Sequence, residues 1–242
     1  MPATGNNSLH TYRMSICLAA DGFSLSVSNP SGGNSPLQAE EHYGIAPGML
    51  AQELHRALTR PRIMDYRYAC VEIVTDTPST FLPLEDFRSS EVPSIYRLCF
   101  PQAEVRSEDI RYELLSAQEI VVLFTADARC VQAVQRLYPE ATLRSWQGRL
   151  LEEASEAVRR IRGSARQLFV NIGRERMCIC MAGKGTPPFA CAYEATEEAD
   201  QLYYILSVWK ALELDATRDV LHVQGVSDSL HERLSQYIQE IL

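Results

Sequence analysis

One segment near the C-terminus has the residue types of a nucleophile site. The segment 225–229, Gly-Val-Ser-Asp-Ser, differs by one residue from the G-x-S-x-G elbow that presents the serine of α/β-hydrolases. That class needs its acid and histidine after the serine, and only residues 230–242 remain, with His231 already inside a predicted helix. Ser229 and Glu232 instead have the spacing of a capping box. We therefore expect the segment to begin the last helix.

Two other features suggest anion binding. The segment 182–185, Ala-Gly-Lys-Gly, has the Gly-Lys pair of a Walker loop, but it lacks the upstream glycine and the Ser or Thr after the lysine. We expect a hairpin turn there. A group of arginines lies near the junction of the two halves. Cations are favoured at a helix C-terminus and on a solvated edge, so these arginines do not require a bound anion. They are Arg159, Arg160, Arg162, Arg166, Arg174 and Arg176.

The cysteines and histidines do not have the spacing of a metal site. The cysteines are Cys17, Cys70, Cys99, Cys130, Cys178, Cys180 and Cys191. Their number is odd, no CxxC pair occurs, and most lie in apolar runs, which favours buried thiols in a reducing compartment. Cys178 and Cys180 share one face of a predicted strand, yet no second Cys/His pair accompanies them. Besides His231, the histidines have no neighbours at ligand spacing, so we expect neither zinc nor a disulfide. They are His10, His42, His55 and His222.

Composition argues against several classes of partner. Apolar residues make up 46% and charged residues 22% of the 242 residues, as in ordinary globular proteins. The formal net charge of −8 disfavours nucleic acid and anionic membranes, because both need a basic footprint. No stretch approaches the roughly 18 apolar residues that span a bilayer, and residues 1–8 have no apolar signal core. We expect a cytoplasmic protein with no membrane insertion.

The first half of the chain predicts three strands, a helix and a fourth strand. Asp21-Gly22 is among the strongest two-residue hairpin signals, and Phe23, Leu25 and Val27 alternate with serines after it. The predicted elements are strands over 13–19 and 23–27, a third strand ending at Tyr43, a helix over 47–58 and a strand over 68–74.

The same order of elements returns after a long helix. Between the halves the pattern predicts a hairpin over 110–125, a helix over 131–137, a short strand at Leu143 and a helix over 146–162. The second half then predicts strands over 168–173, 177–181 and 189–193, a helix capped by Thr196, a strand over 219–223 and a last helix.

The segments 16–74 and 169–224 therefore share the order strand, turn, strand, strand, helix, strand. We interpret them as the two halves of a duplication. The predicted fold is of the α/β class, with two lobes of βββαβ type flanking a cleft. The N-terminal lobe takes residues 1–162 and the C-terminal lobe residues 163–242.

Duplicated βββαβ halves joined through a long helix resemble the actin-like ATPase superfamily, whose lobes are ribonuclease H-like. The runs 120–125 (Ile-Val-Val-Leu-Phe-Thr) and 168–173 (Leu-Phe-Val-Asn-Ile-Gly) are similar to the approach to the second phosphate loop in its pilus-assembly members. Nearly the whole chain resembles a bacterial domain-of-unknown-function family that is placed in that superfamily. This family has no agreed activity. The segments that carry this likeness are 15–18, 21–24, 81–84 and 197–200, with Tyr203-Tyr204 after the last.

The resemblance implies two phosphate loops, each a strand-turn-strand with Asp-x-Gly. In active members the glycine lets the turn approach the phosphates, and the aspartate organises water around Mg²⁺ or orients the attacking water. Aligning the two repeats puts Leu18 and Ala20 at the Asp and Gly positions of the first loop. The second loop keeps Gly173 but has Asn171 in place of the acid, which weakens any grip on a hard cation.

A third nucleotide element in active members is a glycine pair after a strand, where adenosine packs. The matching place is 223–227, where Gly225 is the glycine that remains. Asp21 is a candidate for a shifted first loop, although Asp21-Gly22 better predicts a turn.

We therefore expect a non-catalytic actin-like protein, a pseudo-ATPase that acts as an interaction module or scaffold. Its expected partner is another protein or a second copy of itself, with no bound cofactor and no metal. The alternative is a weak or specialised nucleotide-binding ATPase that holds ATP and Mg²⁺ through Asn171, Gly173, Gly225 and Asp21.

Overall fold

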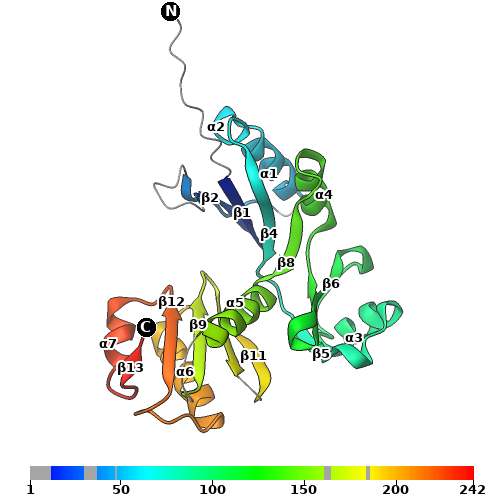
Figure 1. Ribbon diagram of the computed structural model, residues 1–242. Coiled ribbons are helices and arrows are strands. Elements are labelled where there is room, and N and C mark those ends of the chain that lie inside the picture. Colours follow the sequence, from blue (N-terminus) through cyan, green and yellow to red (C-terminus); the bar gives the residue numbers. More distant parts are fainter. Residues whose placement is uncertain (1–11, 30–36, 47, 161–164, 184–185) are drawn as a thin grey trace, which may run out of the picture. The chain divides into compact units, whose positions relative to one another are not determined.

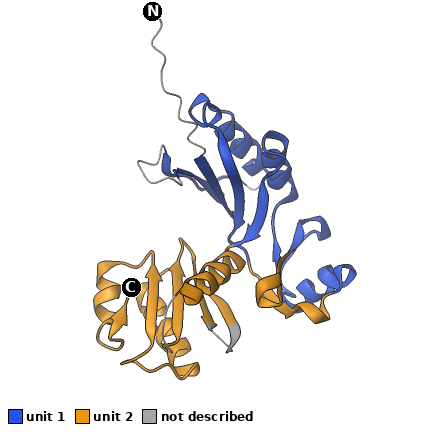
Figure 2. Cartoon of the chain, in the orientation of Figure 1, with its two compact units in different colours: residues 1–77, 88–112, 123–145 blue, residues 78–87, 113–122, 146–242 orange. Residues whose placement is uncertain are grey.

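The computed structural model describes residues 12–29, 37–46, 48–160, 165–183 and 186–242 (Figure 1). Two compact units make up the chain (Figure 2). The first unit takes residues 1–77, 88–112 and 123–145, and the second takes residues 78–87, 113–122 and 146–242. The expected boundary after residue 162 differs from this division, because helix α5 (Trp146–Arg160) packs on the sheet of the second unit.

The first unit is built on a five-stranded sheet in the order β3-β2-β1-β4-β8. Its strands are β1 (Tyr12–Ala19), β2 (Gly22–Ser28), β3 (Leu37–His42), β4 (Tyr68–Thr75) and β8 (Thr142–Ser145). Strand β1 is antiparallel to β2 and parallel to β4. Besides α3 (Val92–Cys99), which lies between β4 and α4 in sequence, the helices of this unit are α1 (Leu50–Leu58), α2 (Pro61–Met64) and α4 (Ala128–Leu137).

Alternation along β1 and β2 explains why one face of this sheet is buried. Met14, Ile16 and Leu18 of β1 point into the core, and the residues between them point to the opposite face. In β2 the buried side chains alternate with serines in the same way. Helix α1 adds Leu50, Leu54, Ala57 and Leu58 from one face, as the helical spacing predicts.

The second unit has a sheet of the same order, β11-β10-β9-β12-β13. Its strands are β9 (Gln167–Ile172), β10 (Arg176–Gly183), β11 (Thr186–Glu194), β12 (Val220–Gln224) and β13 (Glu240–Ile241). Helices α6 (Glu198–Ala211) and α7 (Asp228–Leu234) contribute Ile205, Trp209 and Leu230 to the core on one face. Helix α5 packs mainly on β10, where the core residues Met177, Ile179 and Met181 alternate with the buried Cys178 and Cys180.

Both units therefore have the element order βββαβαβ and the strand order 3-2-1-4-5. The predicted α/β fold with two lobes of βββαβ type is confirmed.

The first unit's pattern is interrupted between β4 and α4. The interrupting segment forms a separate three-stranded sheet in the order β5-β7-β6. In the second unit only residues 225–227 separate β12 from α7. The elements of this insertion are β5 (Thr80–Pro83), α3 (Val92–Cys99), β6 (Ile110–Leu115), β7 (Ile120–Thr125) and the 3-10 turns Leu84–Asp86, Ser89–Glu91, Ser107–Asp109 and Ser116–Gln118. Sequence analysis predicted the β6–β7 hairpin but missed α3.

Two predicted helix caps are wrong. Helix α6 starts at Glu198 with Glu197 as its N-cap residue, so Thr196 lies before the cap. Helix α7 starts at Asp228, and the Oγ of Ser227 accepts a hydrogen bond from Leu230 N at 3.1 Å. Ser229 lies inside the helix and donates to Glu198, at 3.0 Å. Of the predicted turn at 183–185, residues 184–185 lie outside the described residues, as does the predicted end of the long helix at 161–162.

None of the seven cysteines, all in described segments, forms a disulfide. Cys130, Cys178 and Cys180 are buried, Cys17, Cys70 and Cys191 are half-buried, and Cys99 is exposed. Among the described residues, no helix is both long enough and apolar enough to cross a bilayer.

We predict that the cap at Ser227 stabilises the second unit. Ser227→Ala should lower the free energy of unfolding by about 1 kcal/mol, because Leu230 N loses its acceptor. Thr196→Ala is the matched control and should change it by less than about 0.5 kcal/mol. Urea unfolding of both variants measures the difference. Equal losses from the two substitutions would contradict the cap assignment.

Candidate functional site

The carboxyl ends of the parallel strands β1 and β4 carry a pocket of the first unit. Open α/β sheets bind ligands at this edge. The pocket has a volume of about 210 Å³, below the roughly 300–1,000 Å³ of typical small-molecule sites. Its lining includes Leu18, Thr75, Thr77, Asp109, Asp127 and Arg129.

Asp127 sits at the N-terminus of α4 and accepts a hydrogen bond from Arg129 N at 2.8 Å. The guanidinium of Arg129 also donates to this carboxylate, with Nη2 at 2.7 Å from Oδ2. The hydrogen bond from Arg129 holds the pKa of Asp127 below its usual value. Asp127 is therefore a charged, paired cap at neutral pH.

Asp109 binds the same helix end from the insertion. Its Oδ1 accepts a hydrogen bond from Ala128 N at 2.8 Å, and Arg106 Nε donates to its Oδ2 at 2.8 Å. Hydrogen bonding to Asp109 raises the pKa of Arg106. The backbone N–H groups that would hold a phosphate at this helix end are thus engaged by two carboxylates.

The remaining reactive group of this pocket is the thiol of Cys130. Burial raises its pKa to about 12, so it stays protonated at neutral pH and is a poor nucleophile.

The register of the two hairpins corrects the alignment of the phosphate loops. Ala19 pairs with Gly22 across the β1–β2 turn, and Gly173 N donates to Arg176 O at 2.8 Å across the β9–β10 turn. Each turn has two residues, so Ala19 corresponds to Gly173. Cys17 then corresponds to Asn171.

The earlier assignment of Leu18 and Ala20 is therefore wrong by one residue. Leu18 belongs to the buried face of its sheet, as do Leu168 and Val170 in the second unit, with Ile172 packed against them. Asn171 lies on the opposite face, and a slip of one residue exchanges the two faces. The corrected first loop reads Cys17-Leu18-Ala19, which still has neither the acid nor the glycine.

The second unit brings three of the predicted site residues together. Asn171 of β9 pairs with Gln224 of the parallel strand β12, and its Nδ2 donates to Gln224 Oε1 at 3.1 Å. Gly173 follows β9, and Gly225 follows β12. Asp21 lies in the first unit.

Packing accounts for both of these glycines. A Cβ on Gly173 would lie 2.9 Å from the ring of Trp146. Gly225 has a φ of +75°, and its Cβ would lie 2.2 Å from the carbonyl oxygen of Ile172. Gly225 is therefore required by the backbone without any ligand, and the Trp146 ring leaves little room for a side chain at Gly173.

Asp21 occupies the β1–β2 turn, as the hairpin interpretation predicted. Its carbonyl oxygen accepts from Ile45 N at 2.9 Å. A Cβ on the adjacent Gly22 would lie 2.2 Å from His42 O, so this glycine allows β2 and the end of β3 to approach closely.

The arginine cluster includes a structural ion pair. Arg166 donates through Nη2 to the buried Asp219 at 3.0 Å and through Nη1 to Leu212 O at 3.0 Å. Arg176 pairs with Glu194 at 3.0 Å. His222 stacks on Phe169 with ring centroids 4.4 Å apart, and burial lowers its pKa, so it is neutral at pH 7. No group of three or more potential metal ligands occurs among the described residues.

Sequence analysis missed the acidic groups of the first unit's pocket. Asp127 precedes an apolar helical pattern and could have been identified as an N-cap. Asp109 lies far from α4 in the chain, so only the folded insertion reveals its contact with Ala128.

Comparisons with known proteins agree with the fold. A family model described as "Protein of unknown function (DUF3822)" matches residues 4–241. The curated proteins give no match. A crystal structure from Bacteroides thetaiotaomicron VPI-5482, described as a protein with actin-like ATPase fold and unknown function, is 25% identical, with a TM-score of 0.76 over 99% of this chain and 93% of that one.

Two more distant structures are also similar. The cytoplasmic domain of EpsL, an inner membrane component of the type II secretion system of Vibrio cholerae, is 11% identical, with a TM-score of 0.49 over 88% of this chain and 82% of that one. A PilM-PilN type IV pilus biogenesis complex is 14% identical, with a TM-score of 0.47 over 96% and 88%.

We predict that the backbone alone makes Gly225 essential to the fold. Gly225→Ala should lower the free energy of unfolding by about 2 kcal/mol or more, because it adds a clash to the strain of a positive φ. Gly44→Ala, with φ of +71° but open space around it, should cost only about 1 kcal/mol. Gly48→Ala, with open space and no positive φ, should be neutral or stabilising. Urea unfolding gives the order, and a neutral Gly225→Ala would contradict the packing explanation.

Proposed function

Because the chain belongs to the family described as "Protein of unknown function (DUF3822)", we propose its function from its own residues: it is a non-catalytic actin-like protein, a pseudo-ATPase that serves as an interaction module or scaffold. The actin-like fold is the established part of this statement. A fold by itself does not determine an activity, so the proposal depends on the residues of the two loops that correspond to phosphate loops.

The observation that carries the proposal is the pair of residues at the acidic positions of the two phosphate loops. Hairpin register puts Cys17 at one position and Asn171 at the other. A hard cation such as Mg²⁺ is held by oxygen ligands, preferably carboxylates, and neither residue supplies a carboxylate. Asn171 offers one neutral amide oxygen, because its Nδ2 donates to Gln224.

The surroundings of the loops support the same proposal. Packing against Trp146 and Ile172 explains Gly173 and Gly225 without any phosphate. In the first unit, an incoming triphosphate would meet the carboxylates of Asp109 and Asp127 at the end of α4. Both carboxylates are paired with arginines, but they already accept hydrogen bonds from the backbone N–H groups that a phosphate would need.

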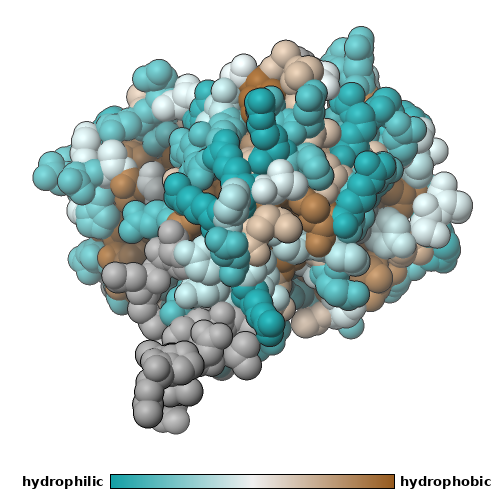
Figure 3. All heavy atoms as spheres, turned by 90° about the horizontal axis from the view of Figure 1, so that it is seen from above, coloured by the Kyte–Doolittle hydropathy of each residue, from teal (hydrophilic) through white to brown (hydrophobic). Residues whose placement is uncertain are grey.

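We further propose that the two lobes arose by duplication and that the insertion between β4 and α4 was added to the first one. The matching strand orders support this. We place the protein in the cytoplasm, a compartment that suits a chain whose seven cysteines form no disulfide. A net charge of −8 and the largely hydrophilic face in Figure 3, where apolar residues lie in small groups, favour a protein partner over nucleic acid or membrane.

A second candidate function is weak nucleotide binding in the second unit, with ATP and Mg²⁺ as cofactors. The observation in its favour is the place of three residues at the carboxyl ends of the adjacent parallel strands β9 and β12, where α/β sheets bind ligands. Asn171 lies near the end of β9, Gly173 follows β9, and Gly225 follows β12.

A thermal melt with Mg-ATP tests the two functions. Binding with a dissociation constant of about 10 μM would stabilise the fold by roughly 2.7 kcal/mol at about 1 mM ATP. For a chain of this length that is a rise of roughly 5–10 °C in Tm. We expect no shift beyond error, with or without Mg²⁺.

The control for the melt is Asn171→Ala, which removes the amide that stands at the acidic position of the second loop. A Mg-dependent rise in the native chain that this variant loses would refute the pseudo-ATPase proposal and establish the second function.

A further inference from the structure

The outer face of α6 carries side chains that neither the core nor the two loops use. Four exposed positions of this helix follow one another at spacings of three or four residues, so they form one stripe along its surface. The stripe consists of Asp200, Tyr203, Ser207 and Lys210. A tyrosine therefore lies next to the acidic end of an exposed helix face.

Packing in the core does not explain Tyr203. The described residues that pack against the core of the second unit include Tyr193 and Tyr204 but not Tyr203, which is 65% exposed. Tyr204 stacks on Tyr193 with ring centroids 4.2 Å apart, and Tyr203 meets Tyr204 at 5.4 Å with an interplanar angle of 67°. The stacked pair thus supports a third ring that is open to solvent.

Two carboxylates beside this ring are available to a cation. Asp200 precedes Tyr203 by three residues, which places the two side chains on neighbouring turns of the same helix face. Glu197 is the N-cap residue of the same helix and is also exposed. Within the part of the chain that the structure describes, neither carboxylate forms an ion pair or a side-chain hydrogen bond.

The other charged groups of this region are engaged or distant. Glu194 pairs with Arg176 at 3.0 Å, and Glu198 accepts a hydrogen bond from Ser229 at 3.0 Å. Lys210 lies seven residues after the exposed tyrosine, or about 10 Å along the helix. The end of the stripe that carries the tyrosine is therefore negative.

An aromatic ring and a carboxylate one helical turn apart suit an arginine side chain. A guanidinium is planar, so it can stack on the negative face of a ring while it donates paired hydrogen bonds to a carboxylate. A lysine ammonium supplies the charge without the plane. Charge complementarity thus favours a cationic partner segment, and the ring favours arginine within it.

We propose that Tyr203, Asp200 and Glu197 form a docking surface for an exposed arginine of a protein partner. The guanidinium lies over the open face of the Tyr203 ring and donates to the carboxylate of Asp200. This proposal rests on the proposed function as an interaction module, and it gives the chemistry of the partner, a short basic segment that contains arginine.

A peptide titration of the full chain tests this surface. The probe is acetyl-Gly-Arg-Gly-Arg-Gly-amide, and the comparison peptides carry lysine or glutamine in place of arginine. Fluorescence anisotropy of dye-labelled peptides measures the affinity, and NMR of isotope-labelled tyrosines locates the contact. We expect the arginine peptide to bind and shift the Tyr203 resonances, the lysine peptide to bind more weakly, and the glutamine peptide not to bind.

Two substitutions test the two halves of the surface. Tyr203→Ala should weaken the binding of the arginine peptide by about two- to five-fold, because an exposed ring loses its contact with a cation. Asp200→Asn should weaken it by a similar factor, because it removes an exposed ion pair. Both residues are exposed, so the fold should tolerate the changes.

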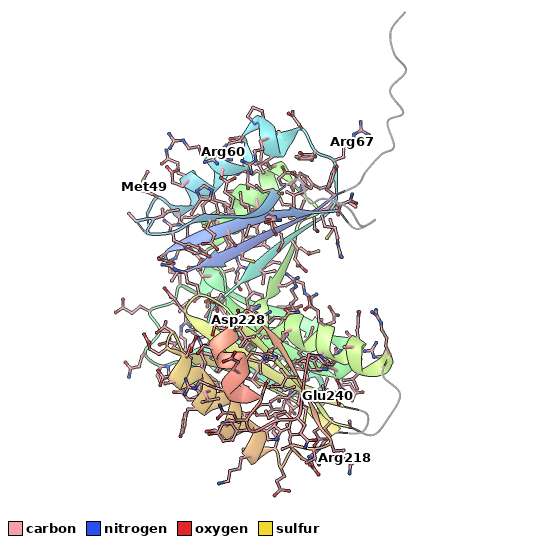
Figure 4. The ribbon with its side chains drawn as sticks, turned by 90° about the vertical axis from the view of Figure 1, so that its left-hand side faces the viewer. Met49, Arg60, Arg67, Arg218, Asp228 and Glu240 are labelled. Atoms are coloured by element: carbon pink, nitrogen blue, oxygen red, sulfur yellow. The ribbon has the colours of Figure 1, made fainter. Side chains whose placement is uncertain are left out.

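The matched controls make the same chemical changes elsewhere in the second unit. Tyr237→Ala removes a tyrosine that is 55% exposed. Asp228→Asn removes an aspartate that lies in the first turn of α7, as Asp200 does in α6 (Figure 4). Both controls should bind the arginine peptide as tightly as the native chain does.

Several results would overturn the proposal. They are equal affinities for the arginine and glutamine peptides, or for the arginine and lysine peptides, native affinity in Tyr203→Ala, and peptide shifts at tyrosines other than Tyr203 and its neighbour Tyr204. A Tyr203 shift that follows the concentration of the chain alone would identify a second copy as the occupant and would also overturn it. The Mg-ATP melt reads the loops and the peptide titration reads α6, so a failure of the proposed function and a failure of this surface are distinguishable.

Discussion

The constraint on which the rest of this structure depends is the one-sided alternation of the central strands β1 and β9. Each buries every second residue against two helices, Ile16 with α1 and α4 in one unit and Val170 with α6 and α7 in the other. Side chains on the opposite face are then fixed by parity. Each strand ends in a two-residue turn, next to a parallel strand. The alternation of buried and opposite-face residues therefore also decides which residues lie at the carboxyl end of each strand.

That alternation decides which side chains the β1–β2 and β9–β10 loops present at the phosphate-loop positions. Because Leu18 must be buried, Cys17 and not Leu18 occupies the place of the first acid. The second loop presents Asn171, bonded to Gln224, with its glycines used by packing. The two lobes share a strand order but differ between their fourth strand and the helix that follows it: after β4 the chain forms a separate three-stranded sheet, whereas three residues follow β12 before α7 begins.

Much of the fold could be predicted from sequence because alternation and turn residues act locally. Phe23, Leu25 and Val27 between serines define β2, and Asp21-Gly22 locates the hairpin, although the two turn residues are Ala20 and Asp21 and Gly22 is the first residue of β2. The loop alignment was wrong by one residue, because the repeats share no identity and only pairing across the turn reveals the register. The cap at Ser227 was missed because Ser229 has the same residue type and a fitting spacing. The contact of Asp109 with Ala128 depends on long-range folding.

The central claim is that neither loop organises Mg²⁺ and phosphate. Amide hydrogen exchange of the full chain, with and without excess Mg-ATP, tests it directly because the method reports protection segment by segment. The account predicts unchanged exchange at residues 17–22, 171–176 and 224–227. Slower exchange confined to these segments when Mg-ATP is present would contradict it.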